Sequence, residues 1–249
     1  MKIFGEFGNT ELFVANVSKG VRNVSLKYFF LLKSMPGDII TLGSGTYDGT
    51  FQTSLNGTKA NPITLKGSSS TILTNTAGGD GLHLLSASFW ILKGFTVTNA
   101  HRGIILEYST NNILTNLYVH HTANAAIHMR FNSTDNIVQN STISFTGLAD
   151  SSNGEGVYNG QSSNLWPIGK PDHSNRNTIV FNYFGPNVAS ESTDIKEGSV
   201  GIVFKNNFIN GTGAGNTSFS RSWVSVKGTN CQIVNNRGIF SVYSGFTVS

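Results

Sequence analysis

This chain of 249 residues has little cysteine and no long apolar segment. A single cysteine, Cys231, excludes an intrachain disulfide, and we expect it to be buried and unreactive at a strand edge. No apolar run is long enough to span a membrane, and the opening residues 1–6 lack the apolar core of a signal peptide. The sequence therefore excludes a disulfide scaffold and a transmembrane helix, and we expect no membrane partner.

Charged residues are also scarce, at 12% of the chain, and they form no run or linker that would divide it. We therefore expect one domain over residues 1–249. The formal net charge is +4, but the basic residues are scattered and match no nucleic-acid-binding module, which disfavours nucleic acid as a partner. An acidic polysaccharide would suit the same charge. A basic surface that serves only solubility is the alternative.

A short pattern recurs along the chain, in which two apolar residues are followed closely by Asn or a small residue. Successive copies begin 22, 24, 42, 23 and 31 residues apart, at Ile91, Ile113, Ile137, Ile179, Ile202 and Ile233. A unit of about 22 to 24 residues with two insertions is typical of a solenoid. Each unit holds short β-branched and aromatic runs separated by Gly, Asn, Ser and Thr, which indicates three short strands per coil.

We therefore predict an all-β fold, a parallel β-helix of about seven to nine coils. Gly and Asn suit its tight turns because they tolerate positive φ, and stacked Asn side chains would bond the turn amides. The general preference of parallel crossovers makes the helix right-handed.

Two predictions concern the ends of the solenoid. Residues 24–35 carry apolar side chains on one side and end at Pro36-Gly37, which predicts an amphipathic helix that caps the first coil. At the other end, residues 245–248 begin a coil that no capping sequence follows. Because uncovered strand edges pair readily, we expect head-to-tail self-association or a cover from elsewhere.

The repeat also predicts which side chains lie side by side. Strand side chains alternate, so the middle residue of the strand that precedes each recurring pattern should point outward. Aligning the coils gives an outward column of His83, Ile105, His128, Tyr158, Asp194 and Ser225. A second column contains Leu85, Glu107, Arg130, Gly160, Lys196 and Lys227. We expect this face to be exposed, and the core to contain Leu84, Leu106, Ile127, Ile195 and Val226.

The densest group of charges on this face is the segment 191–197. Asp194 and Lys196 lie two residues apart on one strand, with Lys227 stacked beside Lys196. Two neighbouring ammonium groups would lower each other's pKa and favour a general base, whereas the nearby carboxylates oppose this. A surface ladder of alternating charges is the alternative interpretation.

Along nearly its whole length the chain resembles the pectate-lyase-like superfamily of right-handed parallel β-helices. The segments 36–42, 45–47 and 60–67 are similar to the opening of the chondroitinase B and alginate lyase family. The resemblance implies a Glu-rich strand that ends in a lysine base, an arginine on the next coil, and Ca²⁺ held by Glu and Asn.

The match to the family's functional residues is partial. Glu191 and Lys196 match the second glutamate and the lysine. Ala189 stands at the place of the first glutamate, and Val226-Lys227 stands where the family has its arginine.

From the resemblance we expect β-elimination on a uronate-containing glycan, with Lys196 removing the proton α to the carboxylate. The other roles would fall to side chains nearby: charge stabilisation to Lys227 or Arg221, protonation of the leaving oxygen to Tyr158 or His128, and Ca²⁺ binding to Glu191 and Asp194.

The insertion at residues 147–176 should overhang the same face, as long loops on solenoids often do. Its Trp166 would stack on a sugar ring or pack within the loop, and Arg130 and Glu155 are further candidates for substrate binding. A hydrolase is the competing enzyme class, because Glu155, Glu191 and Asp194 would supply an acid and a base. No local pattern resembles the aspartates of β-helical polygalacturonases.

Two functional classes remain open on the sequence alone. The first is a polysaccharide lyase, secreted or at the cell surface, that acts on an acidic glycan. The second is a non-catalytic β-helix that binds glycans or forms filaments, which the departures at Ala189 and Val226 favour. The seven N-glycosylation sequons are no signature of secretion, because a chain rich in Asn, Ser and Thr contains about that many by chance.

Overall fold

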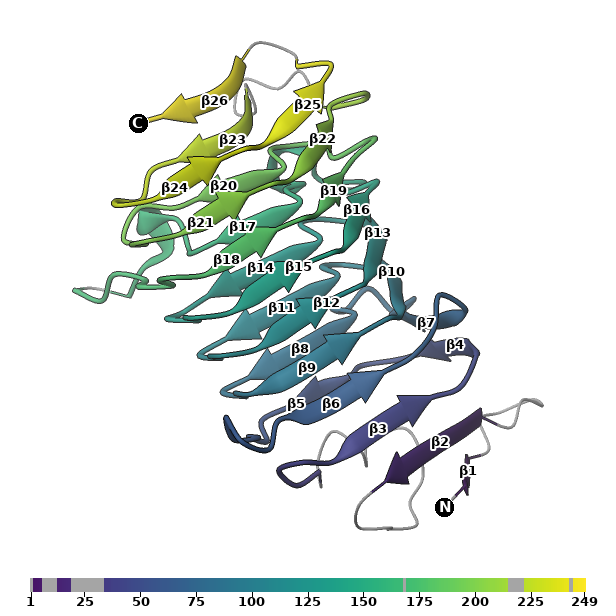
Figure 1. The fold of residues 1–249 in the computed structure, drawn as a ribbon. Helices are drawn as coiled ribbons and strands as arrows, with labels where there is room; N and C mark the ends of the chain where they lie inside the picture. The colour runs from purple at the N-terminus through teal and green to yellow at the C-terminus, as the bar shows by residue number, and fades with distance from the viewer. Residues whose placement is uncertain (1, 6–12, 19–33, 168, 215–221, 242–243) are drawn as a thin grey trace.

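The computed structural model describes residues 2–5, 13–18, 34–167, 169–214, 222–241 and 244–249. They form a right-handed parallel β-helix in which three sheets wind around one core (Figure 1). Helix is limited in these residues to the single turns η1 (Ser151–Asn153) and η2 (Ser163–Leu165). Neither turn is long or apolar enough to cross a membrane. The fold class predicted from the repeat is confirmed.

The three sheets contain ten, eight and eight strands. Sheet A comprises β1 (Lys2–Gly5), β2 (Phe13–Ser18), β3 (Ile39–Leu42), β6 (Ile63–Lys66), β9 (Trp90–Lys93), β12 (Ile113–Thr115), β15 (Ile137–Gln139), β18 (Thr178–Val180), β21 (Val203–Lys205) and β24 (Gln232–Val234). Sheet B comprises β4 (Gly45–Asp48), β7 (Thr71–Thr74), β10 (Thr96–Ala100), β13 (Tyr118–Thr122), β16 (Thr142–Ser144), β19 (Tyr183–Phe184), β22 (Phe208–Asn210) and β25 (Arg237–Ile239). Sheet C comprises β5 (Gln52–Thr53), β8 (Leu82–Leu85), β11 (Ile104–Glu107), β14 (Ile127–Arg130), β17 (Val157–Asn159), β20 (Thr193–Ile195), β23 (Ser222–Val226) and β26 (Ser244–Val248).

The recurring apolar pattern forms strands of sheet A, but the register of the later strands differs from the predicted one. Ile91, Ile113 and Ile137 pair with one another as predicted, but Ile179 pairs with Val138 instead of Ile137. The register follows the residue that points inward, and in β18 that residue is Ile179, which is fully buried. Ile179 and Ile233 are therefore shifted by one position relative to the earlier copies, and Ile202 by one position in the opposite direction.

Alternation on sheet C agrees with the prediction. The expected core residues are buried: Leu84, Leu106, Ile127, Ile195 and Val226. The predicted asparagine stack is also present at a turn. The backbone N–H of Asn112 donates to the side chain of Asn136 at 3.0 Å, and that of Asn136 donates to Asn177 at 2.8 Å. These buried amides satisfy turn groups that water cannot reach.

The structure tests the two predictions about the ends of the solenoid only in part. The capping helix expected at 24–35 lies mostly outside the described residues, and Ser34 and Met35 are not helical. Instead, β2 pairs antiparallel with β3 and covers that edge of sheet A. At the other end β26 is an edge strand, and Phe246 and Val248 are exposed. Head-to-tail association stays a prediction.

Candidate functional site

A cavity of about 580 Å³ lies over the outward face of sheet C. Its floor includes His128, Tyr158 and Asp194, which are in register on β14, β17 and β20 as the alternation predicted. The loops before and after β17 contribute walls, among them Ser152 of η1 and Leu165 of η2. The predicted insertion therefore overhangs this face, although β17 divides it into two loops.

The exposure predicted for this column is wrong. His128, Tyr158 and Asp194 are only 4%, 9% and 4% exposed. They do point away from the core, but the surrounding loops and longer side chains enclose them. Because burial makes ionic interactions stronger and isolated charges costly, the chemistry of these groups differs from that of a surface ladder.

Asp194 is shared by two lysines. Its Oδ2 lies 2.8 Å from Nζ of Lys196, and its Oδ1 accepts a hydrogen bond from Nζ of Lys227 at 2.8 Å. Burial alone would lower the pKa of Lys196, but the attraction of Asp194 outweighs it and raises that pKa above its usual range. The lowering of the pKa expected for Lys196 beside a second lysine therefore does not prevail.

Tyr158 and His128 form a stack beside the lysines. Their rings are 4.4 Å apart, and Nζ of Lys196 lies 5.2 Å from the centre of the Tyr158 ring. Burial raises the pKa of Tyr158, so the phenol keeps its proton at neutral pH. Burial and the charge of Arg130 lower the pKa of His128 to about 3, so its Nε2 is a neutral donor to the carbonyl of Gly160 at 3.1 Å.

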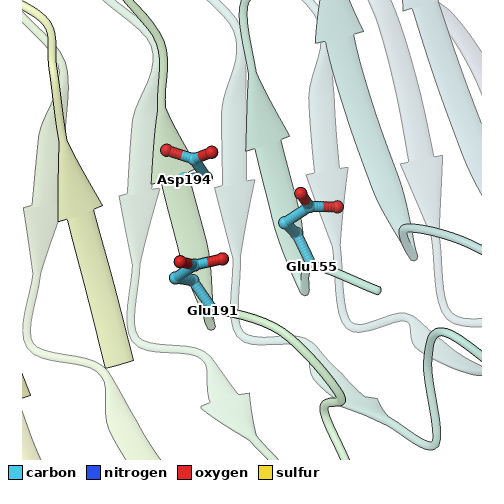
Figure 2. Close-up of side chains that lie close together, drawn as sticks. All are labelled: Glu155, Glu191 and Asp194. Atoms are coloured by element: carbon cyan, nitrogen blue, oxygen red, sulfur yellow. The ribbon is translucent and has the colours of Figure 1, made fainter. Parts of the chain in front are cut away.

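Three buried carboxylates meet at the other side of the cavity (Figure 2). Glu155, Glu191 and Asp194 each place an oxygen within 4.8 Å of the others, so they could hold a metal ion. Glu155 lies just before β17, in the same coil of the solenoid. The backbone N–H of Gly156 donates to the carbonyl of Glu191, and this bond joins that coil to the next. Glu155 thus brings a carboxylate beside Glu191 from the neighbouring coil, whereas Ala189 on the same coil offers none.

The environment of Glu155 and Glu191 opposes negative charge. Burial, and then the charges of Asp194 and Glu191, raise the pKa of Glu155 to about 8. Burial also raises the pKa of Glu191, whose Oε2 accepts a 2.5 Å hydrogen bond from Ser190. Within the described part of the chain, Oε2 of Glu155 has no hydrogen-bond partner. A cation or a donor group of a ligand would satisfy it.

The remaining predicted site residues are dispersed. Arg130 lines the cavity, but Trp166 does not; its indole N–H donates to the carbonyl of Gln161, and its ring lies against Gly198. Arg221 is outside the described residues. Arg102 and Gln161 also line the cavity. The alternation of side chains along a strand could not predict them, because both lie in turns beyond the strand ends.

Solved structures of known proteins share this fold. An alginate lyase from Paenibacillus sp. strain FPU-7 is 33% identical to the chain; the match covers 84% of this chain and 75% of that one, with a TM-score of 0.78. The chain belongs to the pectate-lyase-like β-helix family, within its alginate lyase type. No protein-family model and no curated protein sequence matches this member of the family.

Two more distant neighbours support the fold of the family alone. Pectate lyase Pel9A has a TM-score of 0.62 at 17% identity, over 86% of this chain and 60% of that one. The ORF18 protein of Geobacillus virus E2 has a TM-score of 0.53 at 16% identity, over 80% of this chain and 41% of that one.

Proposed function

We propose that this member of the lyase family cleaves a uronate-containing acidic polysaccharide by β-elimination, outside the cell or at its surface. The observation that carries the proposal is the gathering of Tyr158, Lys196 and Lys227 around Asp194 on the cavity floor. Two ammonium groups attract a polyanion, and a protonated phenol lies beside them. The 33% identical alginate lyase supports the same substrate class.

In β-elimination on a uronate, the C5–H bond and the C4–O bond break and a C4=C5 double bond forms. Lys196 takes the C5 proton, and Lys227 faces the carboxylate on which negative charge builds. Tyr158 gives its proton to the departing oxygen, and its raised pKa keeps the phenol protonated until the C4–O bond breaks. His128 is the weaker candidate for this acid, because its lowered pKa leaves no ionisable proton at neutral pH.

Lys196 must lose its own proton before it acts as a base. In the free site Asp194 keeps it charged, whereas burial favours the neutral amine. A glycan that covers the cavity increases this burial, and Lys227 still neutralises Asp194 when Lys196 turns toward the substrate. Asp194 is therefore a positioning residue for both lysines.

A divalent cation fits the three carboxylates in its ligand chemistry. Ca²⁺ prefers carboxylate oxygens, and Glu155 has a buried oxygen without a partner among the described residues. Glu155 and Glu191 would hold the ion, with Asp194 shared between it and the lysines. When bound, Ca²⁺ would attract the uronate carboxylate and reduce its negative charge.

Hydrolysis is disfavoured by the partners of Asp194. Both of its oxygens are paired with lysines, Lys196 and Lys227, so it is poorly placed to serve as the second carboxyl group of an acid and base pair. A non-catalytic glycan-binding or filament-forming β-helix is the second candidate, favoured by the charged state of Lys196 in the free site.

A substrate screen tests the proposal directly. The protein is incubated with alginate, pectate, glucuronan or chondroitin, and the unsaturated product is followed by its near-ultraviolet absorbance. Product from the wild type that disappears in Lys196→Arg supports the lyase. Binding of these glycans without any product rejects it in favour of the non-catalytic candidate.

A further inference from the structure

Arg130 is held in one orientation before any ligand binds. Its Nε donates to Oε1 of Glu107 at 2.7 Å, and its Nη1 donates to Gln161 at 3.3 Å. Glu107 is in turn bonded through Oε2 to Nε2 of His83 at 3.1 Å. The hydrogen bond to His83 is the largest cause that lowers the pKa of Glu107, to about 2, so the carboxylate that orients Arg130 stays ionised.

Arg102 reaches the same cavity from the other end of the strands. It precedes β11, whereas Arg130 is the last residue of β14. Nε and Nη2 of Arg102 donate to the two oxygens of Asp80, at 2.8 and 3.0 Å. A guanidinium has five N–H donors, so this bidentate pair fixes the group and leaves donors for a ligand. His128 lies close enough to both guanidiniums for their charges to lower its pKa.

Arg130 and Lys196 occupy equivalent positions two coils apart. His128, Tyr158 and Asp194 are aligned on three successive coils. Two residues further along each strand direction, the aligned residues are Arg130, Gly160 and Lys196. The separation along the solenoid is roughly 10 Å, twice the strand spacing. Gly160 places no side chain between the two cations. A glycan that lies along the solenoid axis over this face would therefore pass both cations.

We propose that Arg102 and Arg130 form a second carboxylate-binding subsite, which holds a uronate of the same glycan that is not being cleaved. In this arrangement Glu107 is a positioning residue for Arg130, and His83 fixes Glu107. The proposal rests on the proposed function, because it assumes that a uronate chain enters the cavity. It predicts that the subsite increases the affinity for longer chains and does not change the rate of the chemical step.

The test measures the affinity of uronate oligosaccharides, from dimer to hexamer, by calorimetry in the Lys196→Arg background. We expect affinity to rise with length, and Arg130→Gln or Arg102→Gln to weaken the hexamer about tenfold with little effect on the dimer. Glu107→Gln should act in the same direction as Arg130→Gln. Arg130→Lys, which keeps the charge but loses the planar fork, should give a smaller loss. Arg176→Gln is the matched control, because it removes an exposed arginine that pairs with Asp135 outside the cavity.

Equal losses at every length, or none, would overturn the subsite. Melting temperatures near that of the parent protein show that each variant is folded. With Lys196 restored, the subsite predicts a raised KM for polymer and an unchanged kcat. A lowered kcat at unchanged KM rejects the subsite while the lyase stands. If no glycan gives an unsaturated product but the length-dependent loss of affinity remains, the lyase fails and the subsite stands.

Discussion

Nζ of Lys196 lies 2.8 Å from Oδ2 of Asp194, in a pair that is largely shielded from solvent. The other oxygen of the carboxylate is bonded to Lys227. Removing the Lys196 side chain therefore takes away half of the positive charge around a buried carboxylate, and an effect on stability is expected alongside any effect on catalysis.

For this reason Lys196→Ala and Lys196→Arg should behave differently. Both should reduce formation of unsaturated product by roughly 10²-fold or more, because neither alanine nor a permanently charged guanidinium can act as the base. Lys196→Ala should also lower the melting temperature by several degrees, whereas Lys196→Arg should change it little. Thermal denaturation and near-ultraviolet assays measure the two effects. Full activity in Lys196→Arg would exclude the lysine as the base.

Tyr158→Phe tests the proposed acid. The change removes one hydroxyl and preserves the ring that stacks on His128. We expect kcat to fall about 10²- to 10⁴-fold, the usual contribution of a general acid, with KM nearly unchanged. His128→Asn, which removes the imidazole beneath it, is the comparison. If His128→Asn abolished turnover while Tyr158→Phe retained it, the roles would have to be exchanged.

Alternation and the coil period were sufficient to predict the column from His128 to Asp194. Each strand of sheet C has one inward and one outward set of side chains, so a single correct alignment places residues far apart in sequence on one face. The burial of this face was not predicted. It depends on the loops before and after β17, whose paths follow no repeat.

Glu155 shows a second limit of the sequence pattern. It precedes β17 by two residues, just as Glu191 precedes β20, but neither lies within a strand where alternation fixes direction. Their proximity follows from the pairing of Gly156 with Glu191 across two coils separated by a long insertion. The same reasoning applies to Arg102, which a turn brings into the cavity.

Glu155 also predicts a pH dependence of stability. In the folded protein its pKa is about 8, against 4.5 for an unperturbed glutamate. Below the unfolded pKa both states are protonated; as pH rises toward 8, only the unfolded chain loses this proton, and folding becomes less favourable. In chelator, Glu155→Gln should therefore raise the melting temperature relative to wild type near pH 8 and not near pH 4.

Glu197→Gln is the control for this effect. Its carboxylate accepts a hydrogen bond from Ser163, and the interactions with Ser163 and Lys196 lower its pKa, so its replacement should give no gain near pH 8. An equal change in melting temperature at both pH values for Glu155→Gln would contradict a raised pKa at this position.

Cation binding can be measured without any substrate. If Glu155 and Glu191 hold Ca²⁺, adding the ion at a hundredfold excess over its Kd should stabilise the folded protein by about 2.7 kcal/mol. Glu155→Gln and Glu191→Gln should each reduce this gain, while Asp135→Asn, an exposed carboxylate outside the cavity, should not. Calorimetry with Ca²⁺ alone measures the binding. Unchanged stabilisation in both glutamate variants would place the ion elsewhere.

The register of sheet C is tested by a charge in its core. Ile195 is fully buried between Asn159 and Val226 of the neighbouring strands. Ile195→Asp buries a carboxylate in place of an apolar side chain, at a cost of several kcal/mol, so the melting temperature should fall by roughly 10 °C or more. Val234→Asp, at an outward and exposed position of β24, should change it by no more than about 2 °C. Because a one-residue slip exchanges inward and outward positions, a stable Ile195→Asp would show that the side chains of β20 face the opposite way, and Val234→Asp on sheet A controls for the introduced charge alone.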